Sequence, residues 1–120
     1  MNTPISDFVR SYAASKALRL HMPGHKGKGP LGVEERDITE IGGADVLYQS
    51  EGIIRQSEDN AARLFGAGRT LYSTEGSSLC IRAMIYLAML HARAAGRTPK
   101  IAAGRNAHKT FLTACALLDA

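Results

Sequence analysis

The sequence comprises 120 residues, of which 45% are hydrophobic and 22% are charged. These values are typical of a globular domain and argue against disorder. No apolar run is long enough to span a membrane, and the N-terminus lacks the pattern of a secretory signal. The formal net charge is +4, and the basic excess lies in residues 77–120. Because these cations are scattered, nucleic-acid binding is only weakly indicated, and a small anionic ligand fits as well.

The first fifty residues are expected to hold one helix and a long loop. Apolar residues at helical spacing predict an amphipathic helix over 6–18, with Ser6 as its N-cap. Residues 21–32 contain four glycines and two prolines, which favour a loop over a helix or a central strand. Residues 33–50 are expected to form a mostly irregular connector.

The rest of the chain alternates predicted helices with short β-rich segments. In order, these are a helix over 51–66 ended by Gly66 or Gly68, a strand over 69–74, a helix over 78–95, a strand over 99–104 and a helix starting near Ala107. The helix over 78–95 is apolar almost all round, so we expect most of its faces to be buried. This alternation indicates an α/β fold whose further strands lie outside these 120 residues or on another chain.

The two cysteines, Cys80 and Cys115, lie in apolar helical stretches. Their spacing indicates neither a disulfide framework nor a zinc site, so we expect buried, reduced thiols in a cytoplasmic protein. Asp37 and Glu40 could form a general acid/base pair, but solvated connector residues are the simpler interpretation.

Residues 74–78, Thr-Glu-Gly-Ser-Ser, stand where the first predicted strand ends and a helix begins. The free N–H groups and positive dipole of a helix start favour an anion there. Gly76 lets the backbone approach closely, and the hydroxyls of Ser77 and Ser78 add donors. We therefore expect an anion site, most naturally for a phosphate. The alternative is ordinary N-capping by Ser77 or Ser78.

A second polar cluster, Arg105-Asn106-Ala107-His108-Lys109, follows the second predicted strand. Ligands of open α/β sheets bind beyond the carboxyl ends of strands, so the two clusters are expected to converge on one crevice. There His108 could stack on a flat ligand or act as an acid or base. The alternative is a capping or surface histidine.

A third cluster lies in the loop His21-Met22-Pro23-Gly24-His25-Lys26-Gly27. His21 and His25 are four residues apart, but the intervening proline and glycine prevent the helix that would make them a metal-binding pair. His25 and Lys26 could instead face an anionic ligand, or the loop could simply be solvated.

Five segments together resemble the N-terminal part of the major domain of ornithine/lysine/arginine decarboxylases. They are HMPGHKG at 21–27, DITE at 37–40, EGIIRQSEDNAARLFGA at 51–67, TEGSS at 74–78 and RNAHK at 105–109. These enzymes use pyridoxal 5'-phosphate (PLP) and have the aspartate-aminotransferase-like fold (fold type I). The resemblance implies an incomplete α/β major domain, with residues 1–50 as an N-terminal helix and loop segment and residues 51–120 as the first part of the PLP-binding domain.

The resemblance also implies roles for residues of two motifs. Gly76, Ser77 and Ser78 match the segment that holds the cofactor phosphate, and His108 matches the histidine that stacks on the pyridine ring. Glu75 stands where the family usually has Asn or Gln. In such enzymes the cofactor serves as an electron sink when the amino acid loses CO2.

The resemblance places His25 and Lys26 near the active site or its entrance. The Schiff-base lysine belongs to a Ser-x-His-Lys motif that these 120 residues lack, so this chain alone is expected to be inactive. The full enzyme would be a cytoplasmic homo-oligomer that converts ornithine, lysine or arginine to a polyamine-type amine. The alternatives are an aminotransferase of the same fold type and a non-catalytic anion-binding or interaction fragment.

Overall fold

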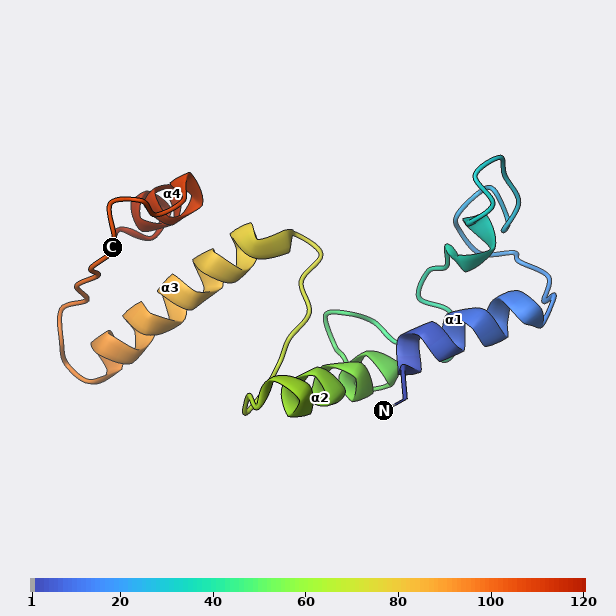
Figure 1. Ribbon diagram of the computed structural model, residues 1–120, viewed down its shortest axis with the longest axis horizontal. Coiled ribbons are helices and arrows are strands. Elements are labelled where there is room, and N and C mark those ends of the chain that lie inside the picture. The colour runs from blue at the N-terminus through green and yellow to red at the C-terminus, as the bar shows by residue number, and fades with distance from the viewer. Residues whose placement is uncertain (1) are drawn as a thin grey trace. The chain divides into compact units, whose positions relative to one another are not determined.

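The computed structural model describes residues 2–120, which contain four α-helices and one short 3-10 helix (Figure 1). In chain order these are α1 (Pro4–Ala14), η1 (Glu34–Arg36), α2 (Ile53–Phe65), α3 (Gly76–Ala94) and α4 (Lys109–Leu118). The chain divides into two compact units, one ending at Tyr72 and the other comprising Ser73–Ala120. The predicted division of the chain at residue 50 stays a prediction.

The predicted α/β fold is wrong for this structure, because residues 2–120 are helical and contain no strand. The two β-rich segments, 69–74 and 99–104, have irregular backbone. A strand is stabilised by hydrogen bonds to a neighbouring strand and by burial of one face. Neither segment has a paired neighbour here, and Leu71 in the first is 63% exposed.

Helix α1 begins before the predicted Ser6 and ends at Ala14 rather than at residue 18. Pro4 occupies its first turn, where a missing N–H costs nothing. The backbone N–H and the hydroxyl of Thr3 donate to the Asp7 carboxylate over 3.0 and 2.9 Å. These hydrogen bonds close the start of the helix, so Ser6 is not the N-cap.

The predicted helix over 51–66 is confirmed by α2, which begins two residues later and ends one residue earlier than predicted. Gly66 has a φ of 63° and serves as the left-handed C-cap, as the sequence predicted. Helices α1 and α2 pack against each other. The amide of Asn60 in α2 donates to the backbone carbonyl and the side chain of Asn2, which precedes α1, each over 3.0 Å.

Glu58 of α2 joins two distant segments of the first unit. Its side chain is only 2% exposed. One carboxylate oxygen accepts the hydroxyl of Ser50 over 2.8 Å, and the other accepts the backbone N–H of Tyr72 over 2.9 Å. Both oxygens of this buried carboxylate therefore have a partner, as a buried charged group requires.

The second unit is built from α3 and α4, which pack around a small core. Ile85 and Met89 of α3 and Ala114 of α4 are buried, and four partly buried side chains surround them: Ile81, Phe111, Cys115 and Leu118. The expectation that α3 is buried on most faces is wrong, because α4 covers one face and Leu87 remains 64% exposed. Both cysteines are free, but Cys80 is exposed and Cys115 half-buried, so the prediction of two buried thiols is wrong.

Because both carboxylate oxygens of Glu58 are hydrogen-bonded, removal of this side chain is expected to destabilise the first unit. Glu58→Ala would leave the part-buried Ser50 hydroxyl and Tyr72 N–H without acceptors, and a fully buried donor left unsatisfied costs about 1–3 kcal/mol, which is the upper limit here. We expect urea unfolding, followed by circular dichroism, to show a loss of up to this size. The matched control is Asp59→Ala, which removes only an exposed ion pair with Arg55 and is expected to cost about 0.5 kcal/mol or less. Equal losses for the two variants would contradict this account.

Candidate functional site

The N-terminus of α3 carries the Thr-Glu-Gly-Ser-Ser segment. The helix starts at Gly76, whose φ is +64°, and a Cβ built on Gly76 would meet no atom within 4 Å. The first N–H groups of a helix have no acceptor within the helix. Glu75 occupies the N-cap position but makes no side-chain capping bond in the described structure. The start of α3 therefore combines open space, free backbone donors and a positive dipole end, which together favour an anion.

The two serines of this segment differ in their surroundings. Ser77 is exposed, whereas Ser78 is half-buried and its Oγ lies 3.4 Å from Oγ1 of Thr110 in α4. Neither hydroxyl caps the helix, so plain N-capping by Ser77 or Ser78, the alternative from the sequence, is not what the structure shows. Both hydroxyls remain available as donors to a ligand.

His108 is the N-cap of α4, and its Nδ1 accepts the backbone N–H of Thr110 over 3.2 Å. The capping alternative for this histidine is thus confirmed. Through Thr110, the structure brings His108 and Ser78 into one cluster within the second unit, whereas convergence of the two motifs on one ligand crevice stays a prediction. The strands that were to cause this convergence are absent from residues 2–120, and the packing of α3 on α4 brings the two residues together instead.

Sequence reasoning passed over Arg82, which lies one helical turn after Ser78. Residues four apart share one face of a helix. Nε of Arg82 is the one buried side-chain polar atom without a hydrogen-bond partner among the described residues. A cation with an unused donor on the Ser78 face adds to the anion preference of the first turns of α3. The spacing from Ser78 is the sequence feature that could have revealed it.

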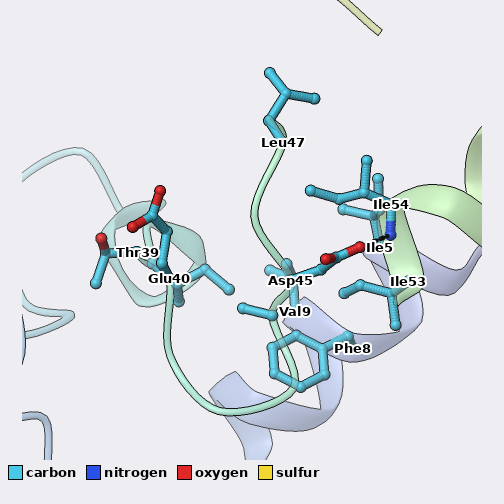
Figure 2. A pocket seen from close by; sticks show the side chains of 11 residues that line it. Ile5, Phe8, Val9, Thr39, Glu40, Asp45, Leu47, Ile53 and Ile54 are labelled. Carbon is cyan, nitrogen blue, oxygen red and sulfur yellow. Dashed lines mark hydrogen bonds between the residues drawn. The ribbon is translucent and has the colours of Figure 1, made fainter. Parts of the chain in front are cut away.

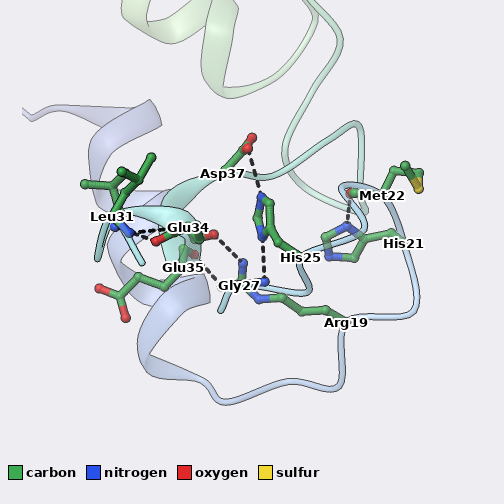
Figure 3. A network of polar contacts seen from close by, with 10 residues as sticks. Arg19, His21, Met22, His25, Gly27, Leu31, Glu34, Glu35 and Asp37 are labelled. Carbon is green, nitrogen blue, oxygen red and sulfur yellow. Dashed lines mark hydrogen bonds and ion pairs between the residues drawn. The ribbon is translucent and has the colours of Figure 1, made fainter. Parts of the chain in front are cut away.

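Polar side chains of the loop over 21–27 are hydrogen-bonded within the loop and to neighbouring segments of the first unit (Figure 3). The N–H of Gly27 donates to Nδ1 of His25 over 3.0 Å, and Nε2 of His25 lies 3.0 Å from Oδ2 of Asp37. Because Nδ1 accepts a hydrogen bond, the proton of the neutral ring is on Nε2 and is donated to Asp37. Asp37 is therefore bonded to a loop histidine and is not paired with Glu40.

Lys26 and His21 also have hydrogen-bond partners in the first unit. Nζ of Lys26 donates to the backbone carbonyl of His21 over 2.6 Å. Nε2 of His21 lies 2.7 Å from the hydroxyl of Tyr12, and Nδ1 of His21 is bonded to the carbonyl of Met22. The side chains of His25 and Lys26 are thus hydrogen-bonded to other residues of the first unit. Their placement near an active site stays a prediction.

Two carboxylates that the sequence did not single out organise the first unit. Glu34 accepts the N–H groups of Leu31 and Val33 over 2.9 and 3.0 Å. The hydrogen bond from Leu31 is the largest influence, and it holds the pKa of Glu34 below its ordinary value. Arg19 also contacts this segment, because its guanidinium donates to the backbone carbonyl of Glu34. The same guanidinium lies 4.9 Å from the ring centre of Tyr12.

The second such carboxylate is Asp45, which lies beside the start of α2 (Figure 2). It accepts the backbone N–H groups of Val46, Glu51, Gly52 and Ile54 over 2.8–3.2 Å. Burial raises the pKa of Asp45, but the four hydrogen bonds together lower it more, so the net pKa lies below its ordinary value. Asp45 thereby supplies the capping acceptor that α2 itself lacks.

A pocket of about 380 Å³ lies between α1, the connector and α2 (Figure 2). Phe8, Val9 and Ile53 give it apolar walls, and Glu40 and Asp45 are its carboxylates. Because the Asp45 oxygens are taken up by backbone donors, the pocket offers little polar chemistry. Residues 2–120 also hold no cluster of three or more potential metal ligands. None of the helices in this range has the length and apolar character needed to cross a bilayer.

Acid is expected to destabilise the first unit. The pKa values of Asp7, Glu34 and Asp45 are lowered in the folded chain, so the folded state binds fewer protons than the unfolded state. The stability that they contribute is complete above their ordinary pKa of about 4 and is lost as the pH falls toward the lower folded-state values. Thermal melts followed by circular dichroism should show the Tm falling as the pH is lowered below about 5.

Asp45→Asn should lower the Tm at neutral pH and weaken its dependence on pH, because the amide carries no titrating charge and has only one acceptor oxygen. Glu40→Gln is the matched control, since Glu40 is exposed and caps no helix. An Asp45→Asn variant with the Tm and pH dependence of the parent chain would contradict the capping role.

Comparison with known proteins gave one matching family and several relatives. The family described as "Orn/Lys/Arg decarboxylase, major domain" matches residues 3–120. The chain is 32% identical over 122 residues to an arginine decarboxylase of Bacillus subtilis and 31% identical over 125 residues to one of Halalkalibacterium halodurans. Each match covers 93% of this chain and 24% of the relative, so the chain spans about a quarter of their length. No solved structure gave a significant match.

Proposed function

The chain belongs to the family of the Orn/Lys/Arg decarboxylase major domain, and on that premise we propose that it supplies the first part of a PLP-dependent decarboxylase of a basic amino acid. Arginine is the first substrate to test, because the relatives above are named arginine decarboxylases. The reaction would release CO2 and a polyamine-type amine. We further propose that the complete enzyme is a cytoplasmic homo-oligomer.

The observation that carries this proposal is the donor set at the start of α3. Free N–H groups, the open approach at Gly76 and the hydroxyls of Ser77 and Ser78 suit the three oxygens of a phosphate. The unpartnered Nε of Arg82 adds a cation on the same helix face. These groups fit the phosphate of PLP, and they would hold the cofactor at that end.

His108 supports the proposal from the second motif. Its Nδ1 is engaged by Thr110, which fixes the ring at the start of α4. Stacking uses the face of an imidazole and would leave this hydrogen bond intact. When bound, PLP supplies a ring that accepts the electron pair left by departing CO2. The role of this chain is then to bind the phosphate and to orient the ring beside His108.

The proposal assigns phosphate binding to this chain but not catalysis. The lysine that attaches the cofactor in this family belongs to a Ser-x-His-Lys motif, which is absent from the 120 residues. We therefore expect the chain with added PLP to release no CO2 from arginine, lysine or ornithine. A longer protein that contains both this chain and the Ser-x-His-Lys motif is expected to release CO2 from arginine, lysine or ornithine. A complete product that transfers amino groups without releasing CO2 would favour the aminotransferase alternative.

Phosphate binding is testable with pyridoxine 5'-phosphate, which lacks the aldehyde that condenses with surface lysines. Calorimetric titration should show binding, and pyridoxine without phosphate should bind far more weakly. We expect Ser78→Ala to weaken binding about 10-fold or more, because a hydrogen bond to a charged group contributes about 1.5–3 kcal/mol. Ser11→Ala, an exposed serine of α1, is the matched control. Equal affinity for the two ligands would contradict a phosphate site.

A further inference from the structure

Thr110 is the one buried polar side chain of the second unit, with 7% of its surface exposed. Its Oγ1 lies 3.0 Å from Nδ1 of His108 and 3.4 Å from Oγ of Ser78. Its backbone N–H also donates to Nδ1 of His108 over 3.2 Å. A single buried hydroxyl thus stands between the two motifs to which the cofactor-binding residues are assigned.

The direction of these hydrogen bonds follows from the donors and acceptors available. A backbone N–H can only donate, so Nδ1 of His108 is an acceptor and the proton of the neutral ring is on Nε2. The Thr110 hydroxyl must then donate to Nδ1 as well, since two lone pairs would otherwise face each other. Its oxygen is left as an acceptor for the Ser78 hydroxyl.

The lengths of the two contacts separate their roles. At 3.0 Å, the bond to His108 is of ordinary length. At 3.4 Å, the contact with Ser78 is long for a pair of hydroxyls, so the Ser78 proton is held weakly. Thr110 can therefore fix the imidazole while the Ser78 hydroxyl turns toward an anion.

We propose that Thr110 is a positioning residue, whose backbone N–H sets the Nε2–H tautomer of His108 and whose buried hydroxyl fixes the rotamer, so that the ring is held beside Ser78. It acts through these two residues and does not itself touch the ligand. The inference rests on the proposed function, because it gives His108 and Ser78 a shared ligand. The core contacts of Ala114 and Met89 keep α4 against α3, which maintains the distance between Thr110 and Ser78.

The test compares Thr110→Val, which keeps the shape and loses the hydroxyl, with Thr110→Ser, which keeps the hydroxyl. Thr113→Val is the matched control, because Thr113 lies on the same helix and its hydroxyl donates only to the backbone carbonyl of Thr110. Nitrogen-15 NMR of the ligand-free 120-residue chain reports which His108 nitrogen is protonated, and three-bond couplings report its χ1 rotamer. Circular dichroism verifies that each variant keeps its helices.

We expect the parent chain, Thr110→Ser and Thr113→Val to show an unprotonated Nδ1 and one rotamer, and Thr110→Val to show rotamer averaging. Thr110→Val should also bind pyridoxine 5'-phosphate about 3- to 10-fold more weakly, the size expected for one neutral hydrogen bond. A protonated Nδ1 in the parent chain at neutral pH, or a single unchanged rotamer in a folded Thr110→Val, would overturn the inference. If the parent chain shows the expected NMR result but binds no pyridoxine 5'-phosphate, the proposed function fails while the positioning role stands.

Discussion

Carboxylates that accept backbone N–H groups are the interaction on which the first unit depends. Residues 19–52 contain only a single 3-10 turn, so many of their N–H groups have no partner in a helix or sheet. Glu34 accepts two of these groups and Asp45 accepts four, while Glu58 holds the N–H of Tyr72. A backbone donor left unpaired would cost free energy, so these side chains make the irregular segments compatible with a folded unit.

The N-terminus of α3 differs from the N-termini of α1 and α2 in having no carboxylate partner among the described residues. At α1 and α2, a carboxylate of the chain itself meets the helix N-terminus: Asp7 for the first and Asp45 for the second. At α3 no side chain of the described residues takes that place, although Glu75 stands next to it. Uncapped backbone N–H groups beside two hydroxyls distinguish this helix start, and they lie in the segment that resembles the phosphate-binding motif of the decarboxylases.

The features that were predicted correctly from the sequence depend only on residues close together in the chain. Gly66 ends α2 because only the local backbone has to turn left-handed there, and the apolar spacing over 53–65 is a property of one helix. The strands were predicted wrongly because pairing depends on a partner that residues 69–74 do not have in this structure. The bond of Glu58 to Tyr72 joins residues fourteen apart through a loop, and no local pattern indicates it.

The same difference between local features and contacts of distant residues holds for the candidate site. Glycine and serines at a helix start suggested an anion site, and the cap by His108 was a stated alternative from local sequence. The contact of Thr110 with Ser78 spans 32 residues and depends on how α4 packs on α3, so only the structure could reveal it. Arg82 was not predicted, because the sequence does not show whether a single cation in an apolar helix is solvated or buried. The structure shows that its Nε is buried and unpaired among the described residues.

The most direct test of this account is to map where a phosphate ester binds. An amide-resolved NMR titration of the nitrogen-15-labelled chain with pyridoxine 5'-phosphate is expected to shift the backbone amides of Gly76, Ser77 and Ser78 most strongly. The side-chain signals of His108 should move in the same titration. Shifts confined to the loop over 21–27 or to the lysines at the surface, with the amides at the start of α3 unchanged, would contradict the assignment of the phosphate site.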